Sequence, residues 1–224
     1  TTPGAERIKR FLADELRLVP DAGVLISDSR VLYTRLSGGL AHWARCIECA
    51  PFRLRVLGTA GSGKTQLALG VMTDAIGAGR RLLYVCYNRP LADHIARIAP
   101  AGCDVFTYHQ LCDRLYRAAG HVPDFTRADA FATLEAFMAD FAPAPAAQYE
   151  ELVVDEGQDF APAWKDNLLR MLRPEGRAWW LEDPSQNLYG RTAVPLPGWV
   201  TLRADTNYRS PKDIVALLGR MTDL

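Results

Sequence analysis

The sequence predicts an α/β domain in which a mainly parallel central sheet is flanked by helices on both faces. From Arg53 onward, short apolar stretches alternate with amphipathic stretches of helical length. A glycine-rich stretch, Gly58 to Gly63, joins the first of these apolar stretches directly to a helix. Because parallel strands need crossover connections, strands and helices that alternate along the chain indicate a parallel sheet with helices on its faces.

The individual elements follow from the hydrophobic pattern after Arg53. The expected strands are 53–57, 82–87, 104–107, 151–154, 178–181 and 199–202. The expected helices are 64–76, 91–98, 109–119, 127–141 and 162–172. More than forty residues separate the third strand from the fourth, and turn-forming residues flank the helical part of this segment. A small helical insertion is therefore expected at about 120–148.

Residues 1–50 do not follow the alternating pattern. They are expected to form a helical lead-in to the main domain of residues 51–224, with helices near 6–18 and 37–49 and a short apolar piece at 24–26. The chain begins at Thr1 rather than at a methionine, which suggests a piece of a longer protein or a processed product.

The composition is typical of a soluble protein with no global affinity for nucleic acid. Hydrophobic residues make up 49% and charged residues 23%, and the formal net charge is zero, so any nucleic-acid contact needs a local basic patch. No apolar run is long enough to span a membrane, and the expected location is cytoplasmic. Five cysteines fit a reducing compartment, and Cys46 and Cys49 lack the second pair of ligands that structural zinc requires.

A phosphate-binding loop is the strongest functional signal. The stretch is Gly58-Thr59-Ala60-Gly61-Ser62-Gly63-Lys64-Thr65, directly after a strand and directly before a helix. Its glycines let backbone N–H groups surround a phosphate, and the helix N-terminus adds partial positive charge. Lys64 is expected to reach the β- and γ-phosphates, and Thr65 to offer its hydroxyl to Mg²⁺.

A second signal is a hydrophobic strand that ends in acidic residues, Leu152-Val153-Val154-Asp155-Glu156-Gly157-Gln158-Asp159. Such an ending places carboxylates at the edge of the sheet beside the phosphate-binding loop. Asp155 is expected to hold Mg²⁺, partly through water, and Glu156 to orient the water that attacks ATP. Together the two signals predict a nucleoside triphosphatase.

The residues around these signals resemble superfamily 1 DNA helicases of the UvrD/Rep type. The acidic stretch is similar to the Asp-Glu-x-Gln-Asp box of that family, and further boxes follow in the family's order. They are Tyr84 to Ala92 (motif Ia), Phe106 to Leu111 (motif Ib), Leu181 to Tyr189 (motif III) and Asn207-Tyr208-Arg209-Ser210 (motif IV). The resemblance covers Gly58 to Ser210.

The resemblance implies a three-layer RecA-like P-loop NTPase domain, the helicase domain 1A, that uses ATP and Mg²⁺. It assigns phosphate sensing to Gln186, adenine stacking to Tyr208 and a γ-phosphate contact to Arg209, with Gln66 next to the nucleotide. It also implies single-stranded or partly duplex DNA as the partner of the full-length protein. The residues implied in DNA contact are Tyr87, Asn88, Thr107, His109 and Tyr189. Each of them also has a structural alternative, as a core aromatic, a helix-start residue or a packing residue.

Four features depart from the family pattern. No glutamine precedes Gln66, so the adenine-reading glutamine motif is absent, and Tyr189 is followed by Gly190 where the family often has a further aromatic nearby. The insertion is small, and residues 207–224 only start the connection to a second RecA-like lobe, which is missing from this chain together with motifs V and VI.

Three functions remain open on the sequence alone. The first is the motor domain of a helicase that couples ATP hydrolysis to translocation on single-stranded DNA. The second is a DNA-stimulated ATPase of a nuclease or repair system that does not unwind. The third is a nucleotide-binding interaction module, which fits the isolated piece because loss of an arginine finger alone costs about 10³- to 10⁵-fold in rate.

Overall fold

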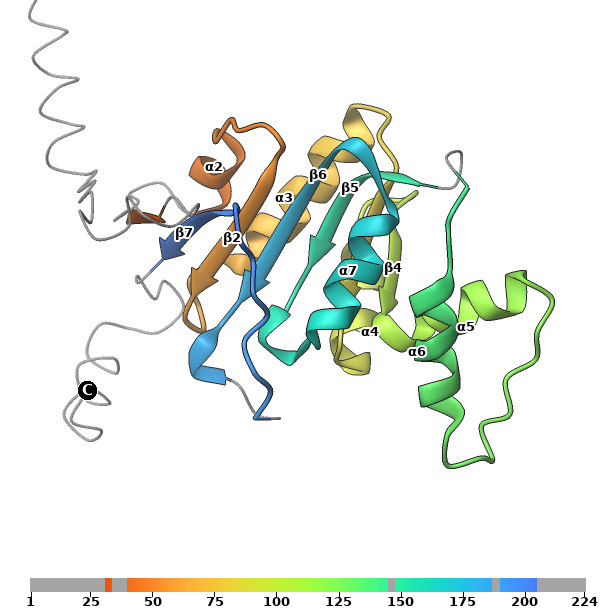
Figure 1. The fold of residues 1–224 in the computed structure, drawn as a ribbon. Coiled ribbons are helices and arrows are strands. Elements are labelled where there is room, and N and C mark those ends of the chain that lie inside the picture. The colour runs from red at the N-terminus through yellow and green to blue at the C-terminus, as the bar shows by residue number, and fades with distance from the viewer. Residues whose placement is uncertain (1–30, 34–39, 145–147, 187–189, 205–224) are drawn as a thin grey trace, which may run out of the picture.

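A seven-stranded parallel sheet forms the centre of the domain (Figure 1). The computed structural model describes residues 31–33, 40–144, 148–186 and 190–204. The strand order is β1-β7-β2-β6-β5-β3-β4, and every neighbouring pair runs parallel. The strands are β1 (Val31–Tyr33), β2 (Arg53–Gly58), β3 (Leu82–Cys86), β4 (Asp104–Thr107), β5 (Tyr149–Val154), β6 (Leu172–Glu182) and β7 (Val200–Ala204). The predicted α/β class with a parallel sheet and flanking helices is confirmed.

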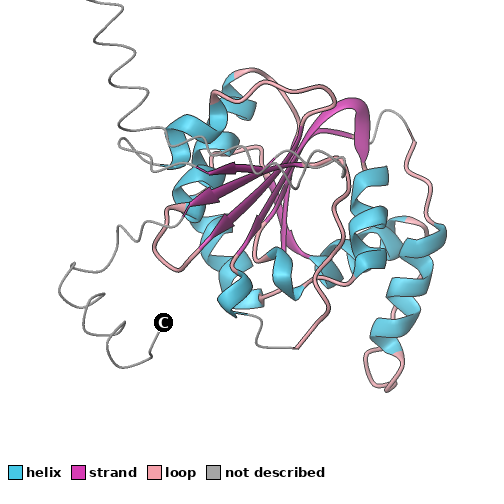
Figure 2. Cartoon of the chain, turned by 60° about the vertical axis from the view of Figure 1, so that its left-hand side comes forward, coloured by secondary structure: helices cyan, strands magenta, loops and turns pink. Residues whose placement is uncertain are grey.

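α-Helices lie between successive strands from β1 to β6 and on both sides of the sheet (Figure 2). They are α2 (Leu40–Arg45), α3 (Lys64–Gly77), α4 (Arg89–Ile98), α5 (Tyr108–Ala118), α6 (Ala130–Asp140) and α7 (Pro162–Arg170), with short 3-10 turns η3 (Gly157–Asp159) and η4 (Pro184–Gln186). The five helices predicted after Arg53 are all present, with ends within a few residues of those expected.

The sheet gains a strand that the sequence pattern does not predict. β1 pairs with β7 at the edge of the sheet. The helix expected at 37–49 is shorter, α2, so Cys46 and Cys49 lie beyond its end. Its Leu40 and Ala44 are buried in the same core as α3. The expected helix at 6–18 and the apolar piece at 24–26 lie outside the described residues.

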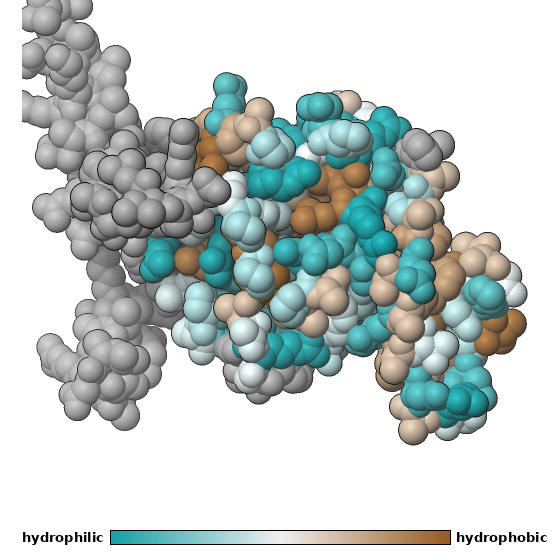
Figure 3. Space-filling view, viewed as in Figure 1, coloured by the Kyte–Doolittle hydropathy of each residue, from teal (hydrophilic) through white to brown (hydrophobic). Residues whose placement is uncertain are grey.

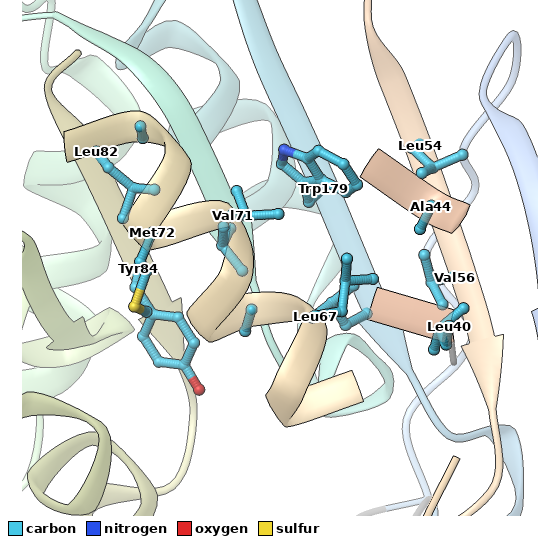
Figure 4. Close-up of a cluster of buried hydrophobic side chains, with 14 of the residues drawn as sticks. Leu40, Ala44, Leu54, Val56, Leu67, Val71, Met72, Leu82, Tyr84 and Trp179 are labelled. Carbon is cyan, nitrogen blue, oxygen red and sulfur yellow. The ribbon is translucent and has the colours of Figure 1, made fainter. Parts of the chain in front are cut away.

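Both faces of the sheet are buried, because helices cover each of them. Successive residues of a strand point to opposite sides and therefore enter different cores. One core, with α2, α3 and α4, takes Leu54, Tyr84, Val153 and Trp179 from the strands. Figure 4 shows α3 packed on this face, with the hydroxyl of Tyr84 at the margin of the cluster. The other core, with α5, α6 and α7, takes neighbouring strand residues such as Val85, Leu152, Val154 and Trp180. This double burial explains why the central strand β3 is a continuous apolar run.

The insertion contributes one described helix, α6, which packs against α5 and α7. The segment joining α5 to α6 extends away from the sheet (Figure 1), and hydrophobic side chains reach the surface of this arm (Figure 3). Val122 and Phe125 of this segment are exposed, and so is Phe131 at the start of α6. Among the described residues, no helix has the length and apolar character that crossing a membrane requires.

Candidate nucleotide site

The carboxyl ends of β2, β5 and β6 lie side by side along one edge of the sheet, and the residues predicted to bind the nucleotide lie there. β6 lies between β2 and β5 and pairs with both. The glycine-rich loop follows β2, Asp155 follows β5, and Asp183 follows β6. Parallel strands end at the same edge, so residues distant in the chain become neighbours, and open α/β sheets bind their ligands at this edge.

The loop after β2 has the backbone of a phosphate cradle. Gly61 and Gly63 have φ angles of 82° and 96°, in the left-handed region that glycine adopts without strain. α3 begins directly after Gly63, which caps the helix without a side-chain hydrogen bond. The first N–H groups of a helix have no partner within the helix, so those of α3 suit an anion.

Two further observations show that the residues of this loop fit a phosphate group. The buried hydroxyl oxygen of Ser62 has no hydrogen-bond partner among the described residues. A Cβ at Gly58 would lie 2.3 Å from that oxygen, so a side chain at this position would force the Ser62 hydroxyl to move. Thr59 and Ala60 are exposed at the turn of the loop, Thr65 is half-buried, and Gln66 is exposed.

Lys64 points back over the loop. Its Nζ donates to the carbonyl oxygens of Gly58 at 2.6 Å and Thr59 at 3.2 Å, and it lies 3.8 Å from Oδ2 of Asp183. The residue is only 8% exposed. The ammonium group is therefore held at the sheet edge, among the oxygens beside the helix N-terminus, where phosphate binding needs a positive charge.

Asp155 is a buried carboxylate fixed from two directions. Oδ2 accepts a hydrogen bond of 2.8 Å from the Tyr84 hydroxyl, and Oδ1 accepts one of 2.9 Å from the backbone N–H of Glu156. Burial and, to a lesser extent, the charge of Glu156 raise the pKa of Asp155 to about 6, against the opposing effects of the Tyr84 hydrogen bond and Lys64. A cation that favours the ionised carboxylate, such as Mg²⁺, suits this position.

Glu156 has an unusual backbone conformation for its residue type. Its φ and ψ angles are 52° and 48°, and it is the one non-glycine residue with positive φ in the part of the chain that the structure describes. A left-handed residue other than glycine costs about 1–3 kcal/mol and is typical of functional sites. The conformation turns the chain sharply after β5, so that Asp155 and Glu156 are followed at once by η3.

A chain of hydrogen bonds connects Glu156 with the loop after β6. The side chain of Gln158 donates to Oε2 of Glu156 at 2.6 Å and accepts from the backbone N–H of Asp183 at 2.9 Å. Asp183 in turn accepts a 2.8 Å hydrogen bond from the side chain of Gln186. Gln186, the expected sensor, is thus connected through Asp183 to both Lys64 and Gln158.

The sequence pattern assigns no role to Gln158 or to Asp183. It also does not indicate that Tyr84 contacts Asp155. Asp183 follows the end of a strand as Asp155 does, and that position is a signal that could have identified it. The contacts of Tyr84 and Gln158 join different strands, and no sequence spacing indicates them.

Asp159 is a second acidic group of this turn with a raised pKa. Burial and the charge of Glu156 raise the pKa of Asp159 to about 6, against the opposing charge of Arg191. Its Oδ1 is buried and has no hydrogen-bond partner among the described residues.

The residues expected to contact DNA lie farther along the same edge, after β3 and β4. Asn88 accepts a hydrogen bond from the N–H of Leu91 and caps α4, whereas Thr107 forms a capping box with Gln110 at the start of α5. Both therefore have a structural role, and their DNA contact stays a prediction.

Tyr87 and His109 belong to an aromatic cluster around Trp164. Tyr87 stacks on Trp164 with ring centroids 5.9 Å apart, and the guanidinium of Arg191 lies 4.7 Å and 4.5 Å from the centres of these two rings. His109 contacts Oε1 of Glu135 through Nε2 at 2.8 Å. The cluster combines flat rings with a cation, as surfaces that bind single strands do. Tyr189, Tyr208 and Arg209 lie outside the described residues.

Comparisons with known proteins give only distant structural likenesses. No protein-family model matches the sequence, and no curated protein matches it. The crystal structure of a DNA replication initiation factor is similar over 99% of this chain with a TM-score of 0.37 at 11% identity. The replication initiator DnaA bound to AMPPCP and single-stranded DNA is similar over 78% of the chain, with a TM-score of 0.38 at 13% identity. The matches cover 51% and 46% of those two chains, about half of their length.

Proposed function

We propose that this chain is the first RecA-like motor domain of a superfamily 1 DNA helicase of the UvrD/Rep type. In the full-length protein it would couple hydrolysis of Mg-ATP to movement along single-stranded DNA. The observation that supports this best is the meeting of Lys64, Asp155 and Asp183 at one sheet edge, beside a loop with an open helix N-terminus.

Each residue of the site has a role that its position supports. The loop N–H groups and Lys64 would bind the phosphates, while Thr65 and Asp155 would hold Mg²⁺. Bound Mg²⁺ would neutralise charge on the phosphate oxygens. Glu156 accepts a hydrogen bond from the attacking water and so orients it. Gln186 occupies the loop after β6, where the resemblance expects a phosphate sensor.

The partner of the site is proposed from the sequence resemblance and the aromatic cluster. Single-stranded DNA would lie along the ends of β3 and β4, over Tyr87 and His109. Tyr208 and Arg209 would contact the nucleotide from the connection to a second lobe, and closure of the two lobes would drive the movement.

A second candidate is a DNA-stimulated ATPase that translocates without unwinding. The observation that favours it is the small insertion, in which α6 is the one helix among the described residues of 120–148. A strand-displacement assay on the full-length protein, run beside a DNA-stimulated ATPase assay, separates the two candidates.

Nucleotide binding is the first test of the proposal. We expect calorimetry to show Mg-ATP and Mg-ADP binding, and Lys64→Ala to weaken it by at least about tenfold, since a charge-assisted hydrogen bond contributes about 1.5–3 kcal/mol. Lys165→Ala is the matched control, because Lys165 contacts Asp166 and the carbonyl of Pro195 outside the site. Equal affinity of both variants for nucleotide would refute the phosphate-loop assignment.

The DNA part of the proposal has its own test. The ATPase of the full-length protein should rise when single-stranded DNA is added at low salt, and the effect should weaken as salt increases. An ATPase that is indifferent to DNA at every salt concentration would refute the motor function while leaving the nucleotide site intact.

A further inference from the structure

We infer that Gln158 is a positioning residue, which holds the Glu156 carboxylate in the orientation needed to direct the attacking water. This inference rests on the proposed ATPase function and extends it to a residue with no assigned role. It is carried by the hydrogen bonds of Gln158, by the conformation of Glu156 and by the charges around the pair.

The side chain of Gln158 is fixed in one orientation. It is 7% exposed, and both ends of its amide have partners. The NH₂ group can only donate, and it faces the Glu156 carboxylate at 2.6 Å; the carbonyl can only accept, and it faces the N–H of Asp183 at 2.9 Å. A flipped amide would place oxygen against carboxylate and N–H against N–H, so the two contacts exclude the alternative orientation.

Glu156 needs such a partner. Glu156 is the residue directly after Asp155, so two carboxyl groups lie close together at the end of β5 and repel each other when both are ionised. The left-handed backbone of Glu156 is itself strained. Among the described residues, the Gln158 amide is the side-chain donor that contacts the Glu156 carboxylate. It therefore opposes the displacement of this carboxylate away from Asp155.

Gln158 also sets the distance between Glu156 and the loop that carries the expected sensor. The Asp183 backbone that Gln158 contacts belongs to the residue whose carboxylate accepts from Gln186 and from Ser185. Glu156 follows β5 and Asp183 follows β6, so a single side chain spans the two loops. Loss of this side chain would free Glu156 to move without removing any group that binds phosphate.

The test uses the full-length protein, which includes the second lobe, and compares binding of two complexes that differ in their resemblance to the transition state. Mg-ADP reports phosphate binding, whereas Mg-ADP with fluoroaluminate also needs the water-orienting carboxylate to be in place. For Gln158→Met, which keeps the length and removes both hydrogen bonds, we expect Mg-ADP affinity within about twofold of wild type. Fluoroaluminate-complex affinity should fall by about 10- to 100-fold, the usual effect of losing a supporting hydrogen bond around a site.

Asn167→Leu is the matched control for burial of an amide. Asn167 is also 7% exposed, and its amide donates to the Tyr108 hydroxyl at 2.8 Å, away from the nucleotide site. This variant should lose thermal stability to a similar extent yet keep the wild-type affinity for both complexes. A structural role of Gln158 alone would make the two variants behave alike.

A pH series on Gln158→Glu gives a second readout that does not depend on the folding of Gln158→Met. The new carboxyl group would repel Glu156 when both are ionised, whereas a protonated carboxyl restores a donor. The affinity of this variant for the fluoroaluminate complex, relative to wild type at the same pH, should therefore recover as pH falls from about 8 to about 5.5. A constant ratio across this range would overturn the inference.

The outcomes also separate the inference from the proposed function. Wild-type protein that does not bind Mg-ADP refutes both. Wild-type protein that binds Mg-ADP but shows no preference for the fluoroaluminate complex overturns the inference, because Glu156 would then not be positioned. If Gln158→Met binds both complexes as wild type does, the inference fails while the nucleotide site stands.

Discussion

Tyr84 lies on β3 and Asp155 directly follows the neighbouring strand β5, and the Tyr84 hydroxyl donates a 2.8 Å hydrogen bond to Oδ2 of Asp155 at the carboxyl ends of the strands. The tyrosine is fully buried and the aspartate is 2% exposed. The ring belongs to the core beneath α3, whereas the hydroxyl lies at the candidate nucleotide site. A single residue thus links core packing to the state of the carboxylate expected to bind Mg²⁺.

Tyr84→Phe should weaken Mg-ATP binding near neutral pH. The hydrogen bond lowers the pKa of Asp155, so its loss moves that pKa upward from about 6. More Asp155 is then protonated at pH 7, and calorimetry across pH should show the binding midpoint at higher pH than in wild type. The variant should also lose about 1–2 kcal/mol in free energy of unfolding.

Tyr149→Phe is the control for this variant. Tyr149 donates to Oδ2 of Asp104 at 2.7 Å, and both residues start their strands, at the opposite edge of the sheet. It should lose stability to a comparable extent without a change in the pH midpoint of nucleotide binding. If both tyrosine variants shift that midpoint equally, Tyr84 does not act through Asp155.

Stability and nucleotide binding should respond to pH in opposite directions. The pKa of Asp155 rises from 3.8 in the unfolded chain to about 6 in the folded one, so the folded state binds this proton more tightly. The free energy of unfolding therefore falls as pH rises through about 4 to 6, by about 3 kcal/mol from this group. Binding of Mg²⁺ needs the ionised form and rises over the same interval.

Asp155→Asn tests the pH effect directly. Melting temperatures measured at low ionic strength without nucleotide should depend less on pH in this variant than in wild type, with the largest gain in stability above pH 6. Asp159 has a raised pKa of about 6 as well and should supply the remaining dependence. An unchanged pH profile in Asp155→Asn would show that Asp155 does not titrate in this range.

The sequence predicts those parts of the fold and site that depend on local pattern. Strand β2, the loop from Gly58 to Gly63 and helix α3 follow from consecutive residues, and so does the acidic end of β5. By contrast, β1 consists of three residues whose pairing with β7 depends on contacts far apart in the chain. β6 begins at Leu172 rather than near 178, because Arg173-Pro174-Glu175-Gly176 lacks the apolar pattern from which a strand is predicted.

The prediction of the site was incomplete because it, too, depends on contacts between residues far apart in the chain. The contacts of Tyr84 with Asp155 and of Gln158 with Asp183 join residues 71 and 25 positions apart. Such contacts can be predicted only when the order of the strands in the sheet is known. The left-handed conformation of Glu156 is likewise unexpected for its residue type, because glutamate has no local preference for it.

Gly157→Ala should destabilise the turn that follows β5. A Cβ at this position would lie 2.1 Å from Nε1 of Trp180, which is fixed by its hydrogen bond to Glu182. The indole is fully buried, so neither partner can move freely, and a loss of about 1–3 kcal/mol is expected. Chemical denaturation measures it, and nucleotide binding should weaken because Glu156 and Gln158 flank the substitution.

Gly77→Ala is the control for that substitution. Gly77 is the last residue of α3, and an added Cβ there meets no atom within 4 Å. Alanine favours helix, so this variant should be as stable as wild type or more stable by about 0.5–1 kcal/mol. Comparable destabilisation of both variants would contradict the packing of Trp180 against Gly157.

Arg191→Gln should weaken binding of single-stranded DNA while leaving nucleotide affinity unchanged. Its guanidinium lies over the rings of Tyr87 and Trp164, where it would meet a phosphate or a stacked base. The slope of log affinity against log salt, measured by fluorescence anisotropy on a labelled oligonucleotide, should decrease in magnitude by about 1. Arg173→Gln removes the same charge at the opposite edge of the sheet, where Arg173 pairs with Glu150, and should leave the slope unaltered. Equal slopes for the two variants would place the DNA path away from the aromatic cluster, since only a contact with the strand releases counterions from it.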